Sequence, residues 1–545
     1  MLISYYHYFI ILIIVKLTYE FKILVYNPVF GSSHSNHMIK IADFLAKNGH
    51  DVSILHAPMN HDTVDTHGKV AKVIRPSTKS KLVEDLFLII NKQLKEIWNV
   101  DNLWNPYHTL AIISNYNKWL AASCEHIIKE DNLTKSIRNK NFDLGIGEAF
   151  IPCVFGMFKY YNVKNHVAVM SGIPFDTHYN EIGINFPIGQ VPSIFGPFSE
   201  DMSFQDRLYN VFFYLTVKYL HNDGVSRGND IFRHNALSYN INLENIFTES
   251  VFYISNTDPL VNYGVPGSPK MIQLGGFLLE KPQPLDSYFD KILNIRKDNV
   301  IISFGTFARS KDMPEGGLNS LAHLFESFPN ITFIYKFEVE NFPFFRRFKN
   351  VITTTWLPQF SLLNDKRVSA FIMHGGENSL LESSRAGVPM LAVPIFYDQP
   401  RNAKMISVLN LGRWIEKSQF INDKYKFVGT FKDVFENPLY KESIKKVSRM
   451  IKKRPYNESE SFLKHIEFAC EFGEVRNFNI GNQKMPFYQR TALDIFLFLI
   501  ICTCTITYLT ISLLKYMYFS LVRKYYILRQ NNKNRLRDRL KQKIQ

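Results

Sequence analysis

Apolar and polar positions alternate in the same way in two separate parts of the chain. In the first part, FKILVYNPVF (21–30) has the pattern of a buried strand, and the polar stretch GSSHSNHM follows it as a loop. MIKIADFLAKNGH has the spacing of an amphipathic helix that ends at Gly49, and DVSILHA is a second strand. This succession predicts a βαβ unit of a doubly wound sheet.

The second part repeats the pattern from residue 299 onward. Apolar runs that predict strands alternate with helical patterns, in the order NVIISFGT, GGLNSLAHLFESF, NITFIYKF, VSAFIMHGG, NSLLESSRAG, VPMLAVPI and QPRNAKMISVLNLG. Two Pro- and Gly-rich stretches, at 262–270 and 280–286, separate this part from the first and predict a linker. The fold class is therefore α/β, with two doubly wound, Rossmann-like domains facing a cleft.

The predicted domain boundaries follow these patterns. They are a signal peptide at 1–19, a first domain at 20–261, a linker at 262–286, a second domain at 287–450, return helices and a membrane-proximal segment at 451–494, a transmembrane helix at 495–514 and a basic tail at 515–545. Long insertions interrupt the first domain between Thr63 and Asn235, and 81–98 and 204–222 read as helices within them. We expect these helices to pack on the domain; the alternative is a membrane-facing acceptor pocket.

The charge of the chain is concentrated at its C-terminus. The net charge is +15, but ten Lys or Arg and one acid, Asp538, lie from Lys515 to the end. The twenty residues before this tail, 495–514, carry no charge and have the length needed to cross a bilayer. A basic segment next to an apolar span indicates membrane topology, with the tail cytoplasmic and the body lumenal, and not nucleic-acid binding.

Both ends of the chain carry targeting signals. Residues 5–15, YYHYFIILIIV, are apolar but too short to span and predict a signal peptide cleaved near Tyr19; an uncleaved anchor is the alternative. Lys541 and Lys543 stand fifth and third from the end and are similar to a dilysine retrieval signal, although a Lys-rich tail also produces such spacing by chance. Together with N-x-[ST] sequons at Asn132, Asn330 and Asn457, this predicts an endoplasmic-reticulum membrane protein.

The cysteines predict neither a disulfide framework nor a metal site. Cys502 and Cys504 lie within the apolar span, and only Cys124, Cys153 and Cys470 lie outside it.

The stretch HGGENSLLE, 374–382, predicts an anion site. Two glycines open a turn before a helix, and the first N–H groups of a helix lack internal partners, so they can bind a phosphate. Asn378 and Ser379 are residues that favour a helix start, and His374 adds a donor. An ordinary strand–turn–helix corner is the alternative.

The wider segment 356–402 resembles the donor-binding signature of the UDP-glycosyltransferases, the membrane-bound glucuronosyltransferase family of animals. The resemblance extends over nearly the whole chain, from signal segment to dilysine-like tail. It implies a GT-B fold whose first domain binds the acceptor and whose second binds a UDP-sugar. It also implies inverting transfer without a metal or other cofactor, and a small lipophilic acceptor as partner. Homo- and hetero-oligomers both stay open.

The resemblance gives each residue of the signature a role in holding the donor. Trp356 would stack on uracil, Gln359 would bind its polar edge, and Glu382 would accept hydrogen bonds from the ribose. The pyrophosphate would lie against His374 and the start of its helix, and the sugar against an acid–amide pair. The remaining donor residues are Gly305, Thr306, Gly376, Asn378 and Ser379 for the phosphates, and Asp398 and Gln399 for the sugar.

The acceptor hydroxyl needs a base, and His34 matches the family's catalytic histidine. It lies in a Gly-Ser-Ser-His turn, sixteen residues before His50, and a neutral imidazole can take a proton near pH 7. His37 is the nearby competitor. The family orients this histidine with an acid; Glu148 stands at that place here, where the family usually has Asp, and Asp143 is the alternative.

Two departures from the family bear on function. Met373 stands where the family usually has a small hydroxyl residue, so one phosphate contact is expected to be missing. Val265 stands where the family commonly has the Arg that is implicated in binding glucuronate, which makes UDP-glucose a candidate donor beside UDP-glucuronate; Lys270 or Arg401 could replace the lost charge. The competing hypotheses are a non-catalytic, membrane-anchored protein that binds a UDP-sugar or a lipophile, and a lipid or sterol glucosyltransferase.

Overall fold

The computed structural model describes residues 20–29, 32–57, 70–100, 106–244, 246–279, 281–480 and 485–544. The predicted signal peptide, 1–19, lies outside these residues. The chain divides into two compact units, 1–481 and 482–545, and each is described by itself.

The first sheet of unit 1 is parallel throughout its described strands, which run in the order β3-β2-β1-β4-β5-β6-β7. Because successive side chains of a strand face opposite sides, β1 sends Leu24 and Tyr26 to one core and Ile23 and Val25 to the other. Its strands are β1 (Lys22–Asn27), β2 (Asp51–His56), β3 (Lys72–Ile74), β4 (Leu144–Glu148), β5 (Asn165–Met170), β6 (Tyr253–Ser255) and β7 (Met271–Gln273).

Helices cover both faces of this sheet. One face packs against α4, α6 and α8, and the other against α2 and α18. The helices between its strands are α2 (Ser32–Lys47), α3 (Lys81–Lys95), α4 (Pro106–Ile128), α5 (Asp131–Asn139), α6 (Pro152–Tyr160), α7 (Asp176–Glu181), α8 (Phe204–Asn235) and α9 (Ile246–Glu249).

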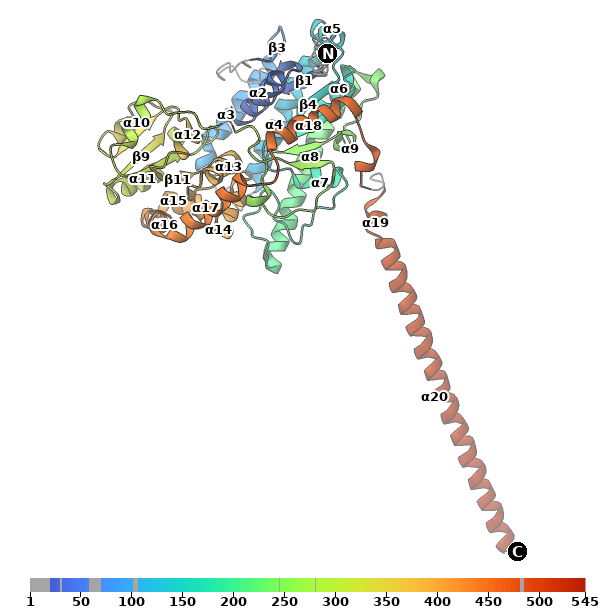
Figure 1. Cartoon of the computed structure of the whole chain (residues 1–545). Helices are drawn as coiled ribbons and strands as arrows, with labels where there is room; N and C mark the ends of the chain where they lie inside the picture. Colours follow the sequence, from blue (N-terminus) through green and yellow to red (C-terminus); the bar gives the residue numbers. More distant parts are fainter. Residues whose placement is uncertain are drawn as a thin grey trace, which may run out of the picture. The chain divides into compact units, whose positions relative to one another are not determined.

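The second sheet is also parallel, with its described strands in the order β10-β9-β8-β11-β12-β13. The strands are β8 (Asp298–Ser303), β9 (Ile331–Lys336), β10 (Val351–Thr354), β11 (Val368–Met373), β12 (Met390–Ala392) and β13 (Gly412–Trp414). The helices are α10 (Ser287–Leu293), α11 (Glu315–Ser327), α12 (Gln359–Leu363), α13 (Glu377–Ala386), α14 (Gln399–Val408), α15 (Lys417–Asn422), α16 (Lys424–Glu436) and α17 (Pro438–Lys452). The strand order within each sheet and the parallel pairing of the strands confirm the predicted α/β class (Figure 1).

Two segments cross from one sheet to the other. The stretch after α17 returns to the first sheet, where α18 (Glu458–Phe472) buries Phe462, Ile466 and Ala469 in the same core as Ile23 (Figure 1). The stretch predicted as a linker, 262–286, contributes β7 to the first sheet before α10 begins the second.

The insertion after α3 also bridges the two halves. Trp98, 1% exposed, packs in the core of the second sheet, and its Nε1 donates to the Arg309 carbonyl at 2.9 Å. Lys417 Nζ donates to the Ile97 carbonyl at 2.7 Å. An insertion of the first half therefore fixes the second half in place beside it.

The structure pairs Cys124 of α4 with Cys153 of α6 in a disulfide, which the sequence did not predict. Their positions 29 residues apart gave no signal, because only the packing of α4 against α6 brings the two sulfurs together.

The predicted insertion helices pack on the domain only in part. The second half of α8 buries Val225, Ile231 and Phe232, as expected. Its first half leaves large apolar side chains at the surface, Phe204, Leu208, Leu215 and Tyr219 among them.

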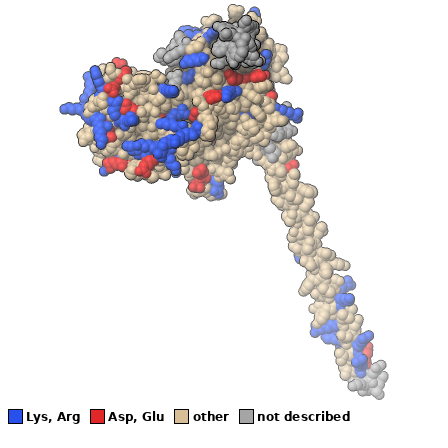
Figure 2. Space-filling view, viewed as in Figure 1, with Lys and Arg blue, Asp and Glu red and all other residues tan. Residues whose placement is uncertain are grey.

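Unit 2 contains α19 (Phe487–Arg490) and α20 (Leu493–Ile544). Within the described residues, α20 is the helix long and apolar enough to cross a membrane, which confirms the predicted C-terminal helix as a candidate span. Its first turn holds one acid, Asp494, residues 495–514 carry no charge, and Lys and Arg gather on its C-terminal part (Figure 2). The helix continues without a break through the predicted tail as far as Ile544.

Candidate active site

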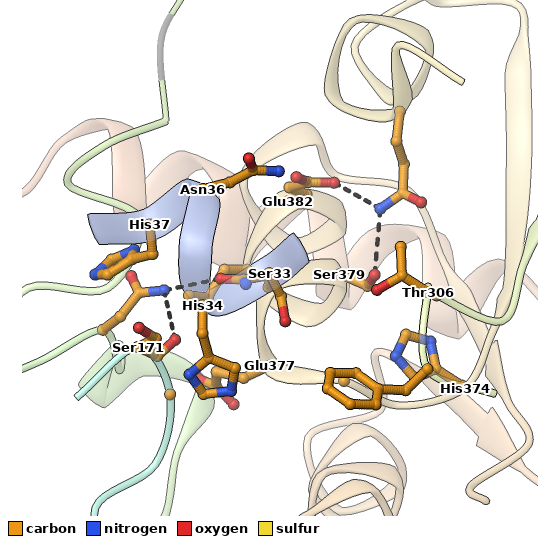
Figure 3. A pocket seen from close by; sticks show the side chains of 18 of the residues that line it. Ser33, His34, Asn36, His37, Ser171, Thr306, His374, Glu377, Ser379 and Glu382 are labelled. Carbon is orange, nitrogen blue, oxygen red and sulfur yellow. Dashed lines mark hydrogen bonds between the residues drawn. The ribbon is translucent and has the colours of Figure 1, made fainter. Parts of the chain in front are cut away.

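A cleft of about 610 Å³ lies between the two sheets of unit 1, at the carboxyl ends of β1, β4, β5, β8 and β11. This is within the size range of small-molecule sites, and in open α/β sheets ligands bind at these strand ends. His34 and Ser171 lie on one side of the cleft, and Thr306, His374 and Ser379 on the other (Figure 3). Every predicted donor residue, and His34, lines it.

His34 lies in the first turn of α2, which begins at Ser32, and not in a loop as predicted. The polar GSSHSNH stretch lacks the apolar periodicity of a helix, but Ser favours a helix start and Met38, one turn further on, is fully buried against the sheet. Burial of the following turns therefore extends the helix back through the polar stretch to Ser32.

Glu148, the last residue of β4, lies directly behind His34. Its Oε2 is 3.5 Å from His34 Nδ1, and the carboxylate is fully buried while His34 is 23% exposed toward the cleft. Ser171 holds the carboxylate from the other side: its N–H donates to Oε1 at 3.0 Å and its hydroxyl to Oε2. Burial alone would raise the pKa of Glu148, but the bonds and charge from His34 and the bonds from Ser171 lower it below its usual value. Glu148 is therefore ionised at neutral pH.

The two alternatives named from the sequence have different surroundings. Asp143 lies just before β4, at the opposite end from Glu148, where it pairs with Lys164 and accepts from the Lys22 N–H. It therefore lies at the wrong edge of the sheet to orient His34. His37 lines the cleft but is 7% exposed, and burial lowers its pKa to about 4.

His374 is clamped between two glycines. A Cβ at Gly376 would lie 2.5 Å from its Nε2, and a Cβ at Gly305 would lie 2.8 Å from the same atom. Gly305 also has a φ of +83°, which favours glycine. Burial and the nearby Lys336 lower the pKa of His374 to about 4, although a hydrogen bond with the Ser303 backbone acts to raise it. The ring is therefore neutral at pH 7 and presents one N–H.

The residues predicted to bind the nucleoside form one connected group. Gln359 Nε2 donates to Glu382 Oε2 at 2.6 Å and to Ser379 Oγ at 3.2 Å (Figure 3). Trp356 is 65% exposed, which leaves its ring accessible to a stacking base. Burial raises the pKa of Glu382 to about 6, although the bond from Gln359 opposes this.

The start of α13 and the loop before α14 complete the cleft. Asn378 Oδ1 accepts from Asn256 Nδ2 at 2.8 Å, a bond between the two halves. Gln399 Oε1 accepts from the N–H groups of Ile395 and Phe396, so its amide oxygen already fixes the loop that carries Asp398. Burial raises the pKa of Asp398 to about 6.

The two departures from the family signature lie away from the cleft. Met373 is fully buried in the core of the second sheet. Val265 packs beside Val191, Tyr263 and Met405, and it is not among the residues that line the cleft.

The two candidate replacement charges are engaged elsewhere. Arg401 donates to the Pro192 carbonyl at 3.2 Å and to Asn262 Oδ1 at 2.8 Å. Lys270 Nζ donates to Asn479 Oδ1 at 2.5 Å and to the Thr248 carbonyl. Neither lines the cleft.

Sequence reasoning missed three residues of the site. Ser171 fixes Glu148, Lys336 Nζ donates to the Gly305 carbonyl at 2.7 Å, and Glu377 is a buried acid at the first position of α13. Lys336 lies at the end of a predicted strand and Glu377 follows the predicted glycine turn, which is the signal that could have found these two; Ser171 follows β5, which the sequence analysis did not predict. Among the described residues, no group of three or more His, Cys, Asp or Glu is placed to hold a metal ion.

The chain matches the model of the family described as UDP-glucoronosyl and UDP-glucosyl transferase over residues 22–526, and it belongs to this family. UDP-glucuronosyltransferase 2B10 of Homo sapiens is 23% identical over 494 residues, which cover 90% of this chain and 92% of the relative. UDP-glucuronosyltransferase 3A1 of Xenopus laevis is 25% identical over 417 residues, which cover 74% of this chain and 76% of the relative.

Solved structures share the fold. The crystal structure of LpCGTa in complex with UDP superposes with a TM-score of 0.52 at 15% identity and covers 82% of this chain and 99% of that one. The glycotransferase of kitacinnamycin superposes with a TM-score of 0.53 at 14% identity, covering 82% and 98%. These likenesses confirm the GT-B arrangement of two facing α/β domains.

Proposed function

We propose that this chain is an inverting glycosyltransferase that transfers a hexose or hexuronic acid from a UDP-sugar to a hydroxyl of a small lipophilic acceptor. The observation that carries the proposal is the pairing of His34 with Glu148 on the wall opposite His374 and the start of α13. One wall can thus activate a hydroxyl while the other holds a leaving pyrophosphate.

In the proposed reaction, His34 takes the proton of the acceptor hydroxyl as its oxygen bonds to the anomeric carbon. Nδ1 faces Glu148, so Nε2 is the atom that receives the proton. The Glu148 carboxylate stabilises the imidazolium that results. The bond from the anomeric carbon to the phosphate oxygen breaks, and the charge that grows on UDP is stabilised by His374 and by the N–H groups at the start of α13.

The lipophilic acceptor is supported by the side chains around His34. The Phe150 ring lies 6.2 Å from the His34 ring, and Ile112, Ile113 and Tyr116 of α4 and Ile173 line the same cleft. Such apolar side chains stabilise an acceptor by burying its apolar surface.

Topology and location are part of the proposal. The uncharged span at 495–514 followed by basic residues supports a type I anchor with a lumenal body. The dilysine-like end, Lys541 and Lys543, supports retention in the endoplasmic reticulum.

The test is incubation of the full-length protein in membranes with a panel of UDP-sugars and a simple phenol. We expect UDP release that depends on the acceptor, together with a product whose mass is that of the phenol glycoside. A non-catalytic binding protein, the alternative, would bind UDP-sugars but release no UDP with any donor. A sterol glucosyltransferase would release UDP with a sterol and not with the phenol.

A further inference from the structure

A buried carboxyl group without a hydrogen-bond partner lies at the start of α13. Glu377 is 6% exposed, and its Oε1 is buried with no bond to a protein atom. Leaving a buried polar atom unpaired is costly, so native proteins rarely do so without a functional reason. Glu377 lines the cleft, where a bound ligand can supply the missing partner (Figure 3).

Glu377 lies where the two walls of the cleft meet. Across the cleft is Gly172, whose added Cβ would lie 3.8 Å from the Glu377 Cβ. Gly172 directly follows Ser171, the residue that holds Glu148. The Glu377 carboxyl therefore lies between the proposed base and the proposed phosphate site, which is where the transferred sugar has to be.

The charges around Glu377 are mainly negative. Burial is the main cause that raises its pKa to about 8; Asp398 and Asp258 raise it further, and Arg401 lowers it. Asp258 is itself paired with Arg454. At pH 7 Glu377 is therefore a neutral carboxylic acid that can donate one hydrogen bond, and Asp398, with a pKa of about 6, is mostly ionised.

The cations of the cleft lie elsewhere. Lys336 Nζ donates to the Gly305 carbonyl and lies over the Trp356 ring. Arg401 is buried outside the cleft lining, with its guanidinium over the Tyr263 ring. Lys40 acts on His37 and Glu382, and Lys281 lies within the stretch predicted as a linker, 262–286. None of these is bonded to Glu377 or Asp398.

We infer that Glu377 is a specificity-determining residue that binds a hydroxyl of the donor sugar and, with Asp398, selects a neutral hexose over a hexuronic acid. The inference rests on the proposed function, because it assigns the sugar end of that site. A hydroxyl satisfies the unpaired Glu377 oxygen, whereas a sugar carboxylate would meet an ionised Asp398 and a second acid. Of the basic groups that act on these two acids, Arg401 is buried and already bonded to the Pro192 carbonyl and Asn262, and His34 is paired with Glu148. Val265 has no part in this selection, since it does not line the cleft.

The test is calorimetric binding of UDP, UDP-glucose and UDP-glucuronate to full-length protein in detergent. We compare wild type with Glu377→Ala and Glu377→Gln at pH 7 and pH 9. Glu315→Gln is the matched control, because Glu315 is the first residue of α11 but is exposed and outside the cleft.

We expect wild type to bind UDP-glucose at least tenfold more tightly than UDP-glucuronate at pH 7. Raising the pH to 9 ionises Glu377 and should widen this ratio severalfold in wild type and in Glu315→Gln, but not in Glu377→Gln. Glu377→Ala should weaken UDP-glucose binding about tenfold and UDP binding by less than twofold.

Tighter binding of UDP-glucuronate by wild type would overturn the inference, as would equal widening of the ratio in Glu377→Gln. An effect of Glu377→Ala on UDP as large as on UDP-glucose would reduce Glu377 to a structural role and also overturn it. Because these measurements need no turnover, they stay informative even if no acceptor is glycosylated, which is the result that would refute the proposed function.

Discussion

Replacing Glu148 by Gln keeps the shape of the side chain and removes the charge behind His34. Opposite charges about 4 Å apart interact by about 4 kcal/mol at an effective dielectric of about 20. His34 Nδ1 and Glu148 Oε2 lie 3.5 Å apart, but His34 is 23% exposed, so water screens part of the interaction. If screening leaves about half of this interaction energy, Glu148→Gln removes ~2 kcal/mol of stabilisation from the imidazolium formed in the transition state. This corresponds to a fall in kcat of about 30-fold.

The assay is kcat at saturating UDP-sugar and phenol, with the Kd of UDP measured in parallel to show that the protein is folded. Glu148→Asp should lose less than Glu148→Gln, because it keeps the charge although its carboxylate is drawn back by one methylene. Asp143→Asn is the control, since Asp143 lies at the other end of β4 and should leave kcat within twofold of wild type. A kcat for Glu148→Gln within threefold of wild type, or a larger loss in Asp143→Asn, would refute the reasoning.

Three further predictions concern the clamp on His374, the buried acids and the membrane anchor. Gly376→Ala should displace the His374 ring and weaken UDP binding by about 1.5–3 kcal/mol, on the order of 10- to 100-fold. Gly429→Ala is the control and should leave UDP binding unchanged, because the space around Gly429 is open. Equal Kd values of UDP for the two variants would argue against the clamp on His374. The raised pKa of Glu377 means that the folded state binds more protons than the unfolded state between about pH 4.5 and 8, so this group's contribution to stability falls as the pH rises through that window. Glu377→Gln should therefore flatten the decline in the thermal midpoint from pH 5 to 8. An unchanged slope of thermal midpoint against pH would contradict the assignment. Protease added to sealed microsomes should remove only the segment after 514, and digestion of unit 1 under those conditions would reject the type I topology.

The arrangement of the sheets could be predicted because it depends on local pattern. The apolar runs that begin at 299 and 368 form β8 and β11, strands with both faces buried, and such runs stand out from the amphipathic helices between them. The start of α2 could not be predicted in this way, because its first turn is polar and is held by the packing of the later turns on the sheet.

The composition of the site could be predicted only as far as the motif extended. His34 and the donor residues predicted within 356–402 line the cleft, and Glu148 lies directly behind His34, although their roles there stay predictions. Val265 was expected to affect the choice of donor sugar because of its place in a motif, but in the folded protein it packs outside the cleft. Glu377 lies inside the motif 374–382 but was given no role, because its burial, its unpaired oxygen and its interaction with Asp398 come from tertiary contacts.

The central claim is that His34 is the base of a glycosyl transfer, and turnover of His34→Ala tests it most directly. The account predicts that kcat with UDP-sugar and phenol falls on the order of 10²–10⁴-fold while the Kd of UDP stays within twofold of wild type. Near-normal turnover by His34→Ala would contradict it, and His37→Ala would then show whether the buried neighbour is the base.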